Sequence, residues 1–171
     1  KAFDFHLNGN LTKAEQLYKN ILKKLPSHFE TLRHLGILYQ DLHKYGAAEK
    51  YYLRAYKINS EHFSIYNNLG TIKFLQFKMD EALEFYKKAF KKNPKYIPVI
   101  NNISAFYHRL MRNEECIKFS KLALSLEPNN KTAKINYAKA LGISGKSDDA
   151  NESIKIFKSI LNDHPDSNNY K

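Results

Sequence analysis

Residues 63–96 read FSIYNNLGTIKFLQFKMDEALEFYKKAFKKNPKY, and the same pattern returns along most of the chain. Two helices are expected in this stretch. The first spans His62 to Gln76, and the second, Asp80 to Lys92, carries apolar residues at i, i+3, i+4 and i+7 spacing. Pro94 ends the second helix because proline cannot continue one. A single helix pair cannot bury its apolar stripe, so neighbouring pairs are expected to stack.

The repeat has a period of 34 residues. Its columns are the prolines Pro26, Pro94 and Pro128, with Ser60 in the remaining place; the small residues Ala14, Ala48, Ala82, Cys116 and Ala150; and the pairs Leu35-Gly36, Leu69-Gly70, Ile103-Ser104 and Tyr137-Ala138. Small residues are expected where neighbouring helices approach closely. Because Cys116 stands in the small-residue column, we expect a buried structural thiol and no reactive one.

These columns resemble the tetratricopeptide repeat (TPR) family over nearly the whole chain. The repeat that carries most of the signature has Leu32, Leu35, Gly36, Tyr39, Ala48, Tyr52 and Ala55. The resemblance implies an all-α fold, a right-handed αα superhelix (solenoid) of about four and a half to five helix pairs. Lys73 and Ser120 depart from the pattern because the family usually has an aromatic residue at both places.

We expect a single TPR domain over residues 1–171, with repeats that share the 34-residue register. The repeats are 1–28 (partial), 29–62, 63–96, 97–130 and 131–167, the last with a three-residue insertion. That insertion lengthens either the turn after Gly145 or the second helix. Both ends read as incomplete repeats, which suggests a fragment of a longer protein and leaves room for self-association through the terminal repeats.

Composition narrows the function classes. The net charge is +11, but the 28 basic residues divide into 24 Lys and 4 Arg. Proteins that recognise nucleic acids rely on Arg for bidentate contacts. We therefore expect the Lys-rich helix faces to be solvated, and we do not expect a nucleic acid as the partner. With one Cys there is no disulfide framework. No stretch is apolar enough to span a membrane, and we expect a cytoplasmic protein.

No catalytic pattern is visible in the sequence. It has no glycine-rich phosphate loop, no HExxH and no GxSxG motif. The His residues are scattered, and His28 and His62 fall at equivalent boundaries of first helices. We therefore expect no enzyme activity, no cofactor and no metal site.

The informative polar feature lies on the first helices of the pairs. Two residues before the glycine column stand His34, Asn68, Asn102 and Asn136, flanked by the polar residues Arg33, Asn67, Thr71, Asn101, His108, Arg109 and Lys139. An Asn amide both donates and accepts, so a row of them can hold a peptide backbone. With helices about 8–10 Å apart and an extended chain rising about 3.3 Å per residue, one clamp per repeat would meet every third peptide residue. The alternative is that these amides bond to neighbouring helices.

The row also resembles the asparagine ladder of O-linked N-acetylglucosamine transferase superhelices, with His34 as the departing position. A clamp for dicarboxylate tails is not supported, because Ile37, Thr71 and Ala105 stand where it needs a polar residue. We expect a non-enzymatic interaction scaffold that binds a protein partner, as an extended peptide or a helix, in its concave groove. The alternatives are the substrate-presenting arm of a larger glycosyl- or sulfotransferase and a basic RNA- or anion-binding solenoid.

Overall fold

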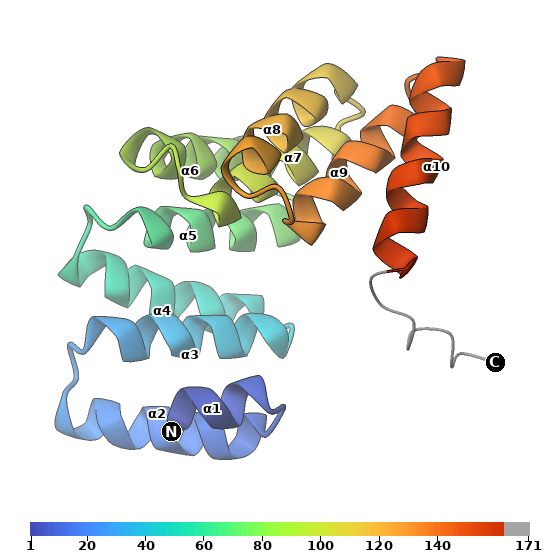
Figure 1. Cartoon of the computed structure of the whole chain (residues 1–171). Coiled ribbons are helices and arrows are strands. Elements are labelled where there is room, and N and C mark those ends of the chain that lie inside the picture. Colours follow the sequence, from blue (N-terminus) through green and yellow to red (C-terminus); the bar gives the residue numbers. More distant parts are fainter. Residues whose placement is uncertain (163–171) are drawn as a thin grey trace. The chain divides into compact units, whose positions relative to one another are not determined.

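The computed structural model describes residues 1–162, and this part of the chain folds into ten α-helices without a β-strand (Figure 1). The predicted all-α class is therefore confirmed. The helices are α1 (Ala2–Leu7), α2 (Leu11–Lys24), α3 (Phe29–Asp41), α4 (Tyr45–Ile58), α5 (Phe63–Leu75), α6 (Met79–Lys92), α7 (Ile97–Arg109), α8 (Asn113–Leu126), α9 (Lys131–Gly142) and α10 (Ser147–Asn162). The predicted end of the last repeat, after residue 162, lies outside the described residues.

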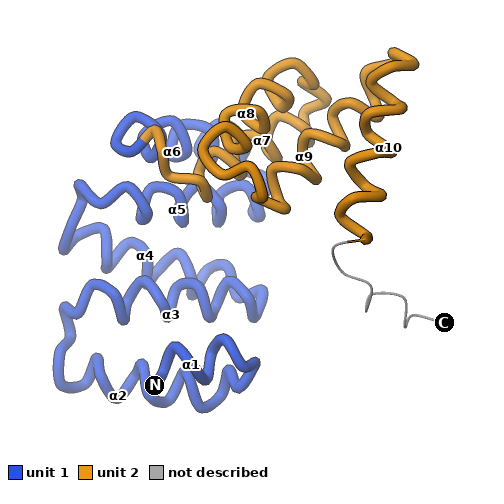
Figure 2. Tube along the Cα trace, viewed as in Figure 1, with its two compact units in different colours: residues 1–93 blue, residues 94–171 orange. Residues whose placement is uncertain are grey.

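The chain divides into two compact units, residues 1–93 and residues 94–171 (Figure 2). Unit 1 holds the helical hairpins α1–α2, α3–α4 and α5–α6, and unit 2 holds α7–α8 and α9–α10. In unit 1 the second helix of one hairpin packs on the first helix of the next, as α2 does on α3 and α4 on α5. In unit 2, α8 packs on α9 in the same way, and α7 also contacts α9. Each hairpin thus buries its apolar stripe against its neighbour.

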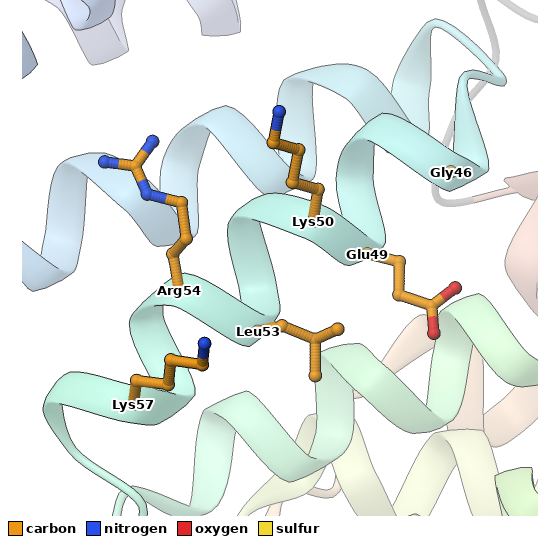
Figure 3. A pocket seen from close by; sticks show the side chains of 6 residues that line it. All are labelled: Gly46, Glu49, Lys50, Leu53, Arg54 and Lys57. Atoms are coloured by element: carbon orange, nitrogen blue, oxygen red, sulfur yellow. The ribbon is translucent and has the colours of Figure 1, made fainter.

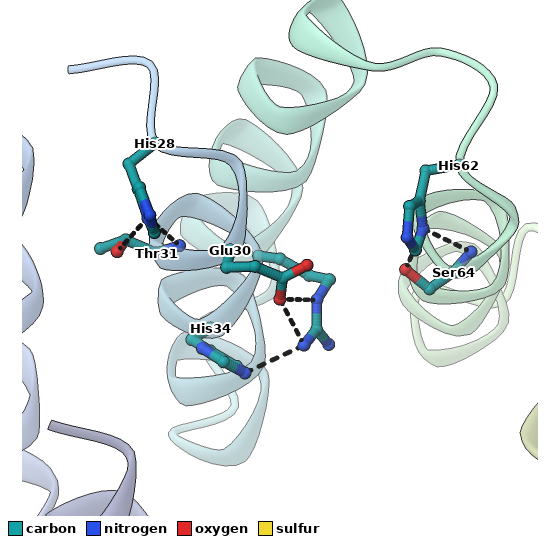
Figure 4. Close-up of polar contacts among 7 residues, drawn as sticks. His28, Glu30, Thr31, His34, His62 and Ser64 are labelled. Atoms are coloured by element: carbon teal, nitrogen blue, oxygen red, sulfur yellow. Dashed lines mark hydrogen bonds and ion pairs between the residues drawn. The ribbon is translucent and has the colours of Figure 1, made fainter. Parts of the chain in front are cut away.

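Histidine side chains cap the N-termini of two first helices, α3 and α5. His28 Nδ1 accepts a hydrogen bond of 3.3 Å from the backbone N–H of Thr31, and His62 Nδ1 accepts one of 3.3 Å from the N–H of Ser64 (Figure 4). Each bond satisfies one of the N–H groups that the first turn of a helix leaves without an intrahelical partner. The expectation that His28 and His62 mark first-helix boundaries is confirmed.

Aromatic rings lie directly on the glycine column in unit 1. A Cβ atom on Gly36 would overlap the Tyr52 ring, and one on Gly70 would lie 2.7 Å from Cδ1 of Tyr86. Both tyrosines are almost completely buried. The two helices of a hairpin can therefore come this close only where the first helix has no side chain.

Unit 2 builds the same contact without an aromatic ring. Ser104 stands in the glycine column and Ser120 in the tyrosine column, and their Oγ atoms are 2.7 Å apart. Ser104 Oγ also donates to the carbonyl of Cys116 at 3.1 Å. Both hydroxyls are fully buried, and these hydrogen bonds offset the free-energy cost of removing them from water.

Four members of the small-residue column are buried as predicted, since Ala14, Ala48, Ala82 and Cys116 have no exposed surface, whereas Ala150 is only partly buried. Burial raises the pKa of the Cys116 thiol, which suits a structural residue and not a nucleophile. Lys73, which departs from the family pattern, is held by Glu49 at 2.9 Å and Glu81 at 2.7 Å. Its contact with Glu49 occupies the same repeat position as the 2.7 Å bond from Tyr39 to Glu15 one repeat earlier.

The last hairpin departs from the 34-residue register. Helix α10 begins at Ser147, 34 residues after α8 begins at Asn113, but it has 16 residues where α8 has 14. Its buried small residue is Ser153, 37 residues after Cys116, whereas Ala150 in the predicted column is only partly buried. Ser153 Oγ donates to the Ala138 carbonyl at 2.8 Å and so takes part in the contact between α9 and α10. The shift of three residues is therefore already present at Ser153.

The turn inside every hairpin contains one residue with a positive φ angle, again at the 34-residue spacing. These residues are Gly9, His43, Phe77, Met111 and Gly145. Glycine adopts this left-handed conformation without penalty, whereas other residues are strained there. Met111 has a φ of 58° and a side chain that is 68% exposed, so its side chain offers little packing in return.

We predict that Gly36→Ala lowers the free energy of unfolding by about 2 kcal/mol, because the new methyl group forces the Tyr52 ring away. The matched control is Gly46→Ala, since a Cβ there meets nothing within 4 Å. That control should leave stability unchanged or raise it by up to about 1 kcal/mol through helix propensity. Urea denaturation of both variants measures the difference, and equal stabilities would contradict the packing of Tyr52 on Gly36.

We predict that Met111→Gly is more stable than Met111→Ala by about 1 kcal/mol, because only glycine relieves the left-handed strain. Both variants remove the same exposed side chain, so the comparison isolates the backbone. The midpoints of urea denaturation provide the measurement. An alanine variant as stable as the glycine variant would show that the turn is not strained at this position.

Candidate peptide-binding surface

All eleven residues predicted to bind a peptide lie on first helices of hairpins. Unit 1 holds Arg33 and His34 on α3 and Asn67, Asn68 and Thr71 on α5; unit 2 holds Asn101, Asn102, His108 and Arg109 on α7 and Asn136 and Lys139 on α9. We call the surface that carries them the first-helix face of each unit. Their environments differ, even among residues that share a column of the repeat.

His34 is enclosed by aromatic rings. Its imidazole stacks on Phe3 and Tyr18 with ring centroids 4.9 and 5.9 Å away. The Arg33 guanidinium donates to His34 Nε2 at 2.9 Å and also pairs with Glu30 at 2.7 Å, in the group of contacts that Figure 4 shows around Glu30 and His34. Burial, with the Arg33 charge second, lowers the pKa of His34 to about 4, so the ring is neutral at pH 7.

The polar residues of α5 are largely bonded to one another. Asn67 Nδ2 donates to Asn68 Oδ1 at 3.5 Å, and the Thr71 hydroxyl donates to the Asn67 carbonyl at 3.0 Å. The Tyr86 hydroxyl donates to Thr71 Oγ1 at 3.3 Å. Asn68 Nδ2 is buried and makes no hydrogen bond. Thr71 therefore has a structural role within its hairpin, whereas Asn68 keeps an unused donor.

In unit 2 the side-chain amides of Asn101 and Asn130 link α7, the connection between α8 and α9, and the first turn of α9. Asn101 Nδ2 donates to Asn130 Oδ1 at 3.0 Å, and Asn130 Oδ1 also accepts the Ala133 N–H at 2.8 Å, which caps α9. Asn130 Nδ2 donates to the Glu127 carboxylate. These bonds fix which end of each amide is oxygen and which is nitrogen. As a result Asn101 Oδ1 is left buried and without a donor.

Asn136 differs from the other members of the Asn row. Its side chain is 6% exposed, and Nδ2 donates to the backbone carbonyl of Asn101 at 3.2 Å. This is the interhelical bond that the structural interpretation of the row anticipates. Asn136 therefore joins α9 to α7 through one of its N–H groups.

A cavity of about 480 Å³ lies beside this amide chain. It is lined by Ile97, Pro98, Asn101, Asn102, Glu127, Asn130 and Thr132. Two of the predicted residues, Asn101 and Asn102, are thus brought together at one cavity. The sequence reasoning missed Glu127 and Asn130 because they lie between helices, at the junction of two repeats around Pro128. It also missed Thr132, which lies in the first turn of α9. Asn130 directly precedes α9, and an Asn at that position can be recognised from the sequence as a helix N-cap.

The remaining predicted residues lie at the other end of the same helices. His108 is half-buried with Nδ1 unbonded, and its pKa is lowered by burial and then by the nearby Lys139 charge. Arg109 and Lys139 are exposed. None of the three lines the cavity.

A second cavity, of about 470 Å³, follows the outer helix α4 (Figure 3). It is lined by Gly46, Glu49, Lys50, Leu53, Arg54 and Lys57. Figure 3 shows Lys50 and Arg54 projecting from one side of α4 and Leu53 from another. The Glu49 carboxylate pairs with Lys73 and accepts a hydrogen bond from Gln76. Arg54 donates to the Pro26 carbonyl at 3.1 Å. This surface is basic and was not among the predicted sites.

Two further expectations concern metals and membranes. Among the described residues, no three His, Cys, Asp or Glu side chains gather closely enough to hold a metal ion. Within residues 1–162, none of the helices combines the length and the apolar character that crossing a bilayer requires.

Comparison with known proteins relates the chain to one repeat family. Models of the tetratricopeptide repeat match residues 30–62 and 63–96. No curated protein sequence matches the chain. The TPR protein TTC0263 of Thermus thermophilus is 19% identical, with a TM-score of 0.83, and the match covers 96% of this chain and 88% of that one.

Two other solved structures are similar in fold. PilF of Pseudomonas aeruginosa is 18% identical, with a TM-score of 0.80, over 92% of this chain and 72% of its own. A MamA structure is 21% identical, with a TM-score of 0.72, over 99% and 97% of the two chains. At these identities the similarity shows the fold alone, and it confirms the predicted helical-repeat class.

We predict that His34→Phe reduces the acid sensitivity of the protein. The unfolded chain takes up a proton at His34 as the pH falls through 6.5, whereas the folded chain resists protonation down to about pH 4. His34 therefore contributes stability above pH 6.5 that is lost as the pH falls toward 4. Phenylalanine keeps the stacking without titrating. Urea denaturation at pH 7.5 and 4.5 should show a smaller loss for the variant, and equal losses would contradict the enclosure of His34.

Proposed function

We propose that this chain, a tetratricopeptide repeat protein and therefore a protein-interaction scaffold, binds an extended peptide segment of its partner at the cavity beside α7 and α9. The family supports protein binding in general. The observation that carries the specific proposal is the amide-lined cavity of about 480 Å³, because it holds Asn101 and Asn102 of one hairpin beside Thr132 of the next. Two consecutive first helices thus present hydrogen-bonding groups to one space.

An extended peptide suits this cavity better than a helix does. A helix satisfies its own backbone groups, whereas an extended chain offers an N–H or a C=O at every residue. Asn101 lines the cavity, and its side-chain oxygen Oδ1 is buried without a hydrogen-bond partner. Its apolar part, Ile97 and Pro98, can cover side chains. A peptide that bonds to the polar wall removes the cost of the unpaired oxygen.

The amides of unit 2 divide into two roles under this proposal. Asn136 holds α9 against α7 through the Asn101 backbone carbonyl and so keeps the cavity in shape. Asn101 and Asn102 line the cavity itself. The peptide is therefore bound by Asn102 of the Asn row together with the neighbouring Asn101, and not by a uniform ladder.

The experiment blocks the cavity from an exposed position. Random twelve-residue peptides are selected by display on the wild-type chain, and the tightest one is titrated into Thr132→Phe. Thr132 is exposed, so the phenylalanine fills the cavity mouth without disturbing the core. We expect the affinity to fall about tenfold or more, as when a contact worth about 1.4 kcal/mol is removed.

The matched control is Thr12→Phe, an equally exposed threonine on α2 that is far from the cavity in the sequence and belongs to unit 1. It should bind the peptide as the wild type does. Thermal melts of both variants establish that they are folded. Unchanged affinity in Thr132→Phe, or the failure of any peptide to bind, would refute this site.

A further inference from the structure

The cavity beside α7 and α9 has an unusual charge for this protein. The chain carries a net charge of +11, and three other cavities of the described part have more basic than acidic lining residues. The basic ones are Lys50, Arg54 and Lys57 along α4, Lys134 and Lys155 beside α10, and Lys1 and Lys24 beside α1, and the acidic ones are Glu49 and Glu152. No Lys or Arg lines the cavity beside α7, and its one charged residue is Glu127. The local charge therefore favours a cation.

Asn101, which lines the cavity, also has a buried oxygen without a donor. Asn101 is 8% exposed, and its Oδ1 has no hydrogen-bond partner. The amide cannot gain one by turning over, because Nδ2 would then leave Asn130 Oδ1, which is already committed as an acceptor from the Ala133 N–H. A buried carbonyl oxygen without a donor is costly. A ligand that brings an N–H group relieves that cost.

We propose that this cavity binds the protonated side chain of a lysine or arginine in the partner peptide, an inference that rests on the peptide-binding function proposed above. The nitrogen donates to Asn101 Oδ1 and to the Glu127 carboxylate, while the methylene groups lie along Ile97 and Pro98. Hydrogen bonds from a charged donor to a carboxylate are stronger than neutral ones. The same walls exclude an acidic side chain, since it would face an acceptor and a carboxylate.

Glu127 is well placed to supply the charge without disturbing the fold. It is exposed at the end of α8, and one of its oxygens already accepts from Asn130 Nδ2. That bond orients the carboxylate and leaves its second oxygen available to a ligand. Replacing Glu127 by Gln keeps an acceptor for Asn130 and removes only the charge.

The experiment uses the peptide selected above on the wild-type chain. Each Lys or Arg of that peptide is replaced in turn by norleucine, which keeps the methylene groups and lacks the charged donor. We expect one replacement to weaken binding about tenfold, in keeping with the loss of a charge-assisted hydrogen bond. Glu127→Gln should weaken binding of the parent peptide by a similar factor and leave the norleucine peptide unaffected.

Two further variants separate the possible outcomes. Glu114→Gln, an exposed glutamate of α8 outside the cavity, should bind as the wild type does. Asn101→Leu removes the unpaired oxygen and should abolish the preference for the basic residue, with a thermal melt to establish that it folds. A peptide that binds at the cavity but tolerates norleucine everywhere overturns this inference and leaves the peptide site intact. A peptide unaffected by Thr132→Phe overturns both.

Discussion

The contact between a tyrosine ring and a glycine inside hairpins of unit 1 sets the spacing from which the remaining structure follows. Tyr52 on Gly36 and Tyr86 on Gly70 bring the two helices of a hairpin together, and the buried alanines on the second helices allow the next hairpin to approach. Because each hairpin buries its stripe only against its neighbours, these short-range distances are repeated along the unit. The first helices are thereby held at a regular spacing, and that spacing sets the intervals between their polar side chains.

The polar surfaces show how identical repeat positions acquire different roles. Asn68 and Asn136 share a column, yet Asn68 Nδ2 is buried without a hydrogen bond, whereas Asn136 Nδ2 donates to the backbone carbonyl of Asn101. Asn101, in the column just before it, has a buried side-chain oxygen without a donor. Basic side chains line the cavity along α4, whereas the cavity beside α7 has a carboxylate. The net charge of +11 is therefore a property of the whole chain, whereas the charged residue that lines this cavity is acidic.

Much of the fold follows from the sequence because packing obeys the 34-residue period. The buried Ala82 and Cys116 and the boundary histidines His28 and His62 were all readable as columns. The site was less predictable, because a column specifies a helical position and not its partners. Asn136 shares a column with Asn102, but only the structure shows its bond to the Asn101 carbonyl. Glu127 and Asn130 lie between helices, where no periodic signal exists.

The paired serines of unit 2 show that the two positions of this contact depend on each other. A serine at the glycine position alone, as at Gly70, would drive its Cβ into the ring of Tyr86. A serine at the tyrosine position alone would leave a void. Ser104 and Ser120 occupy the two positions together and are joined by a hydrogen bond. A side chain at the glycine position of such a hairpin therefore requires that the opposite ring be absent.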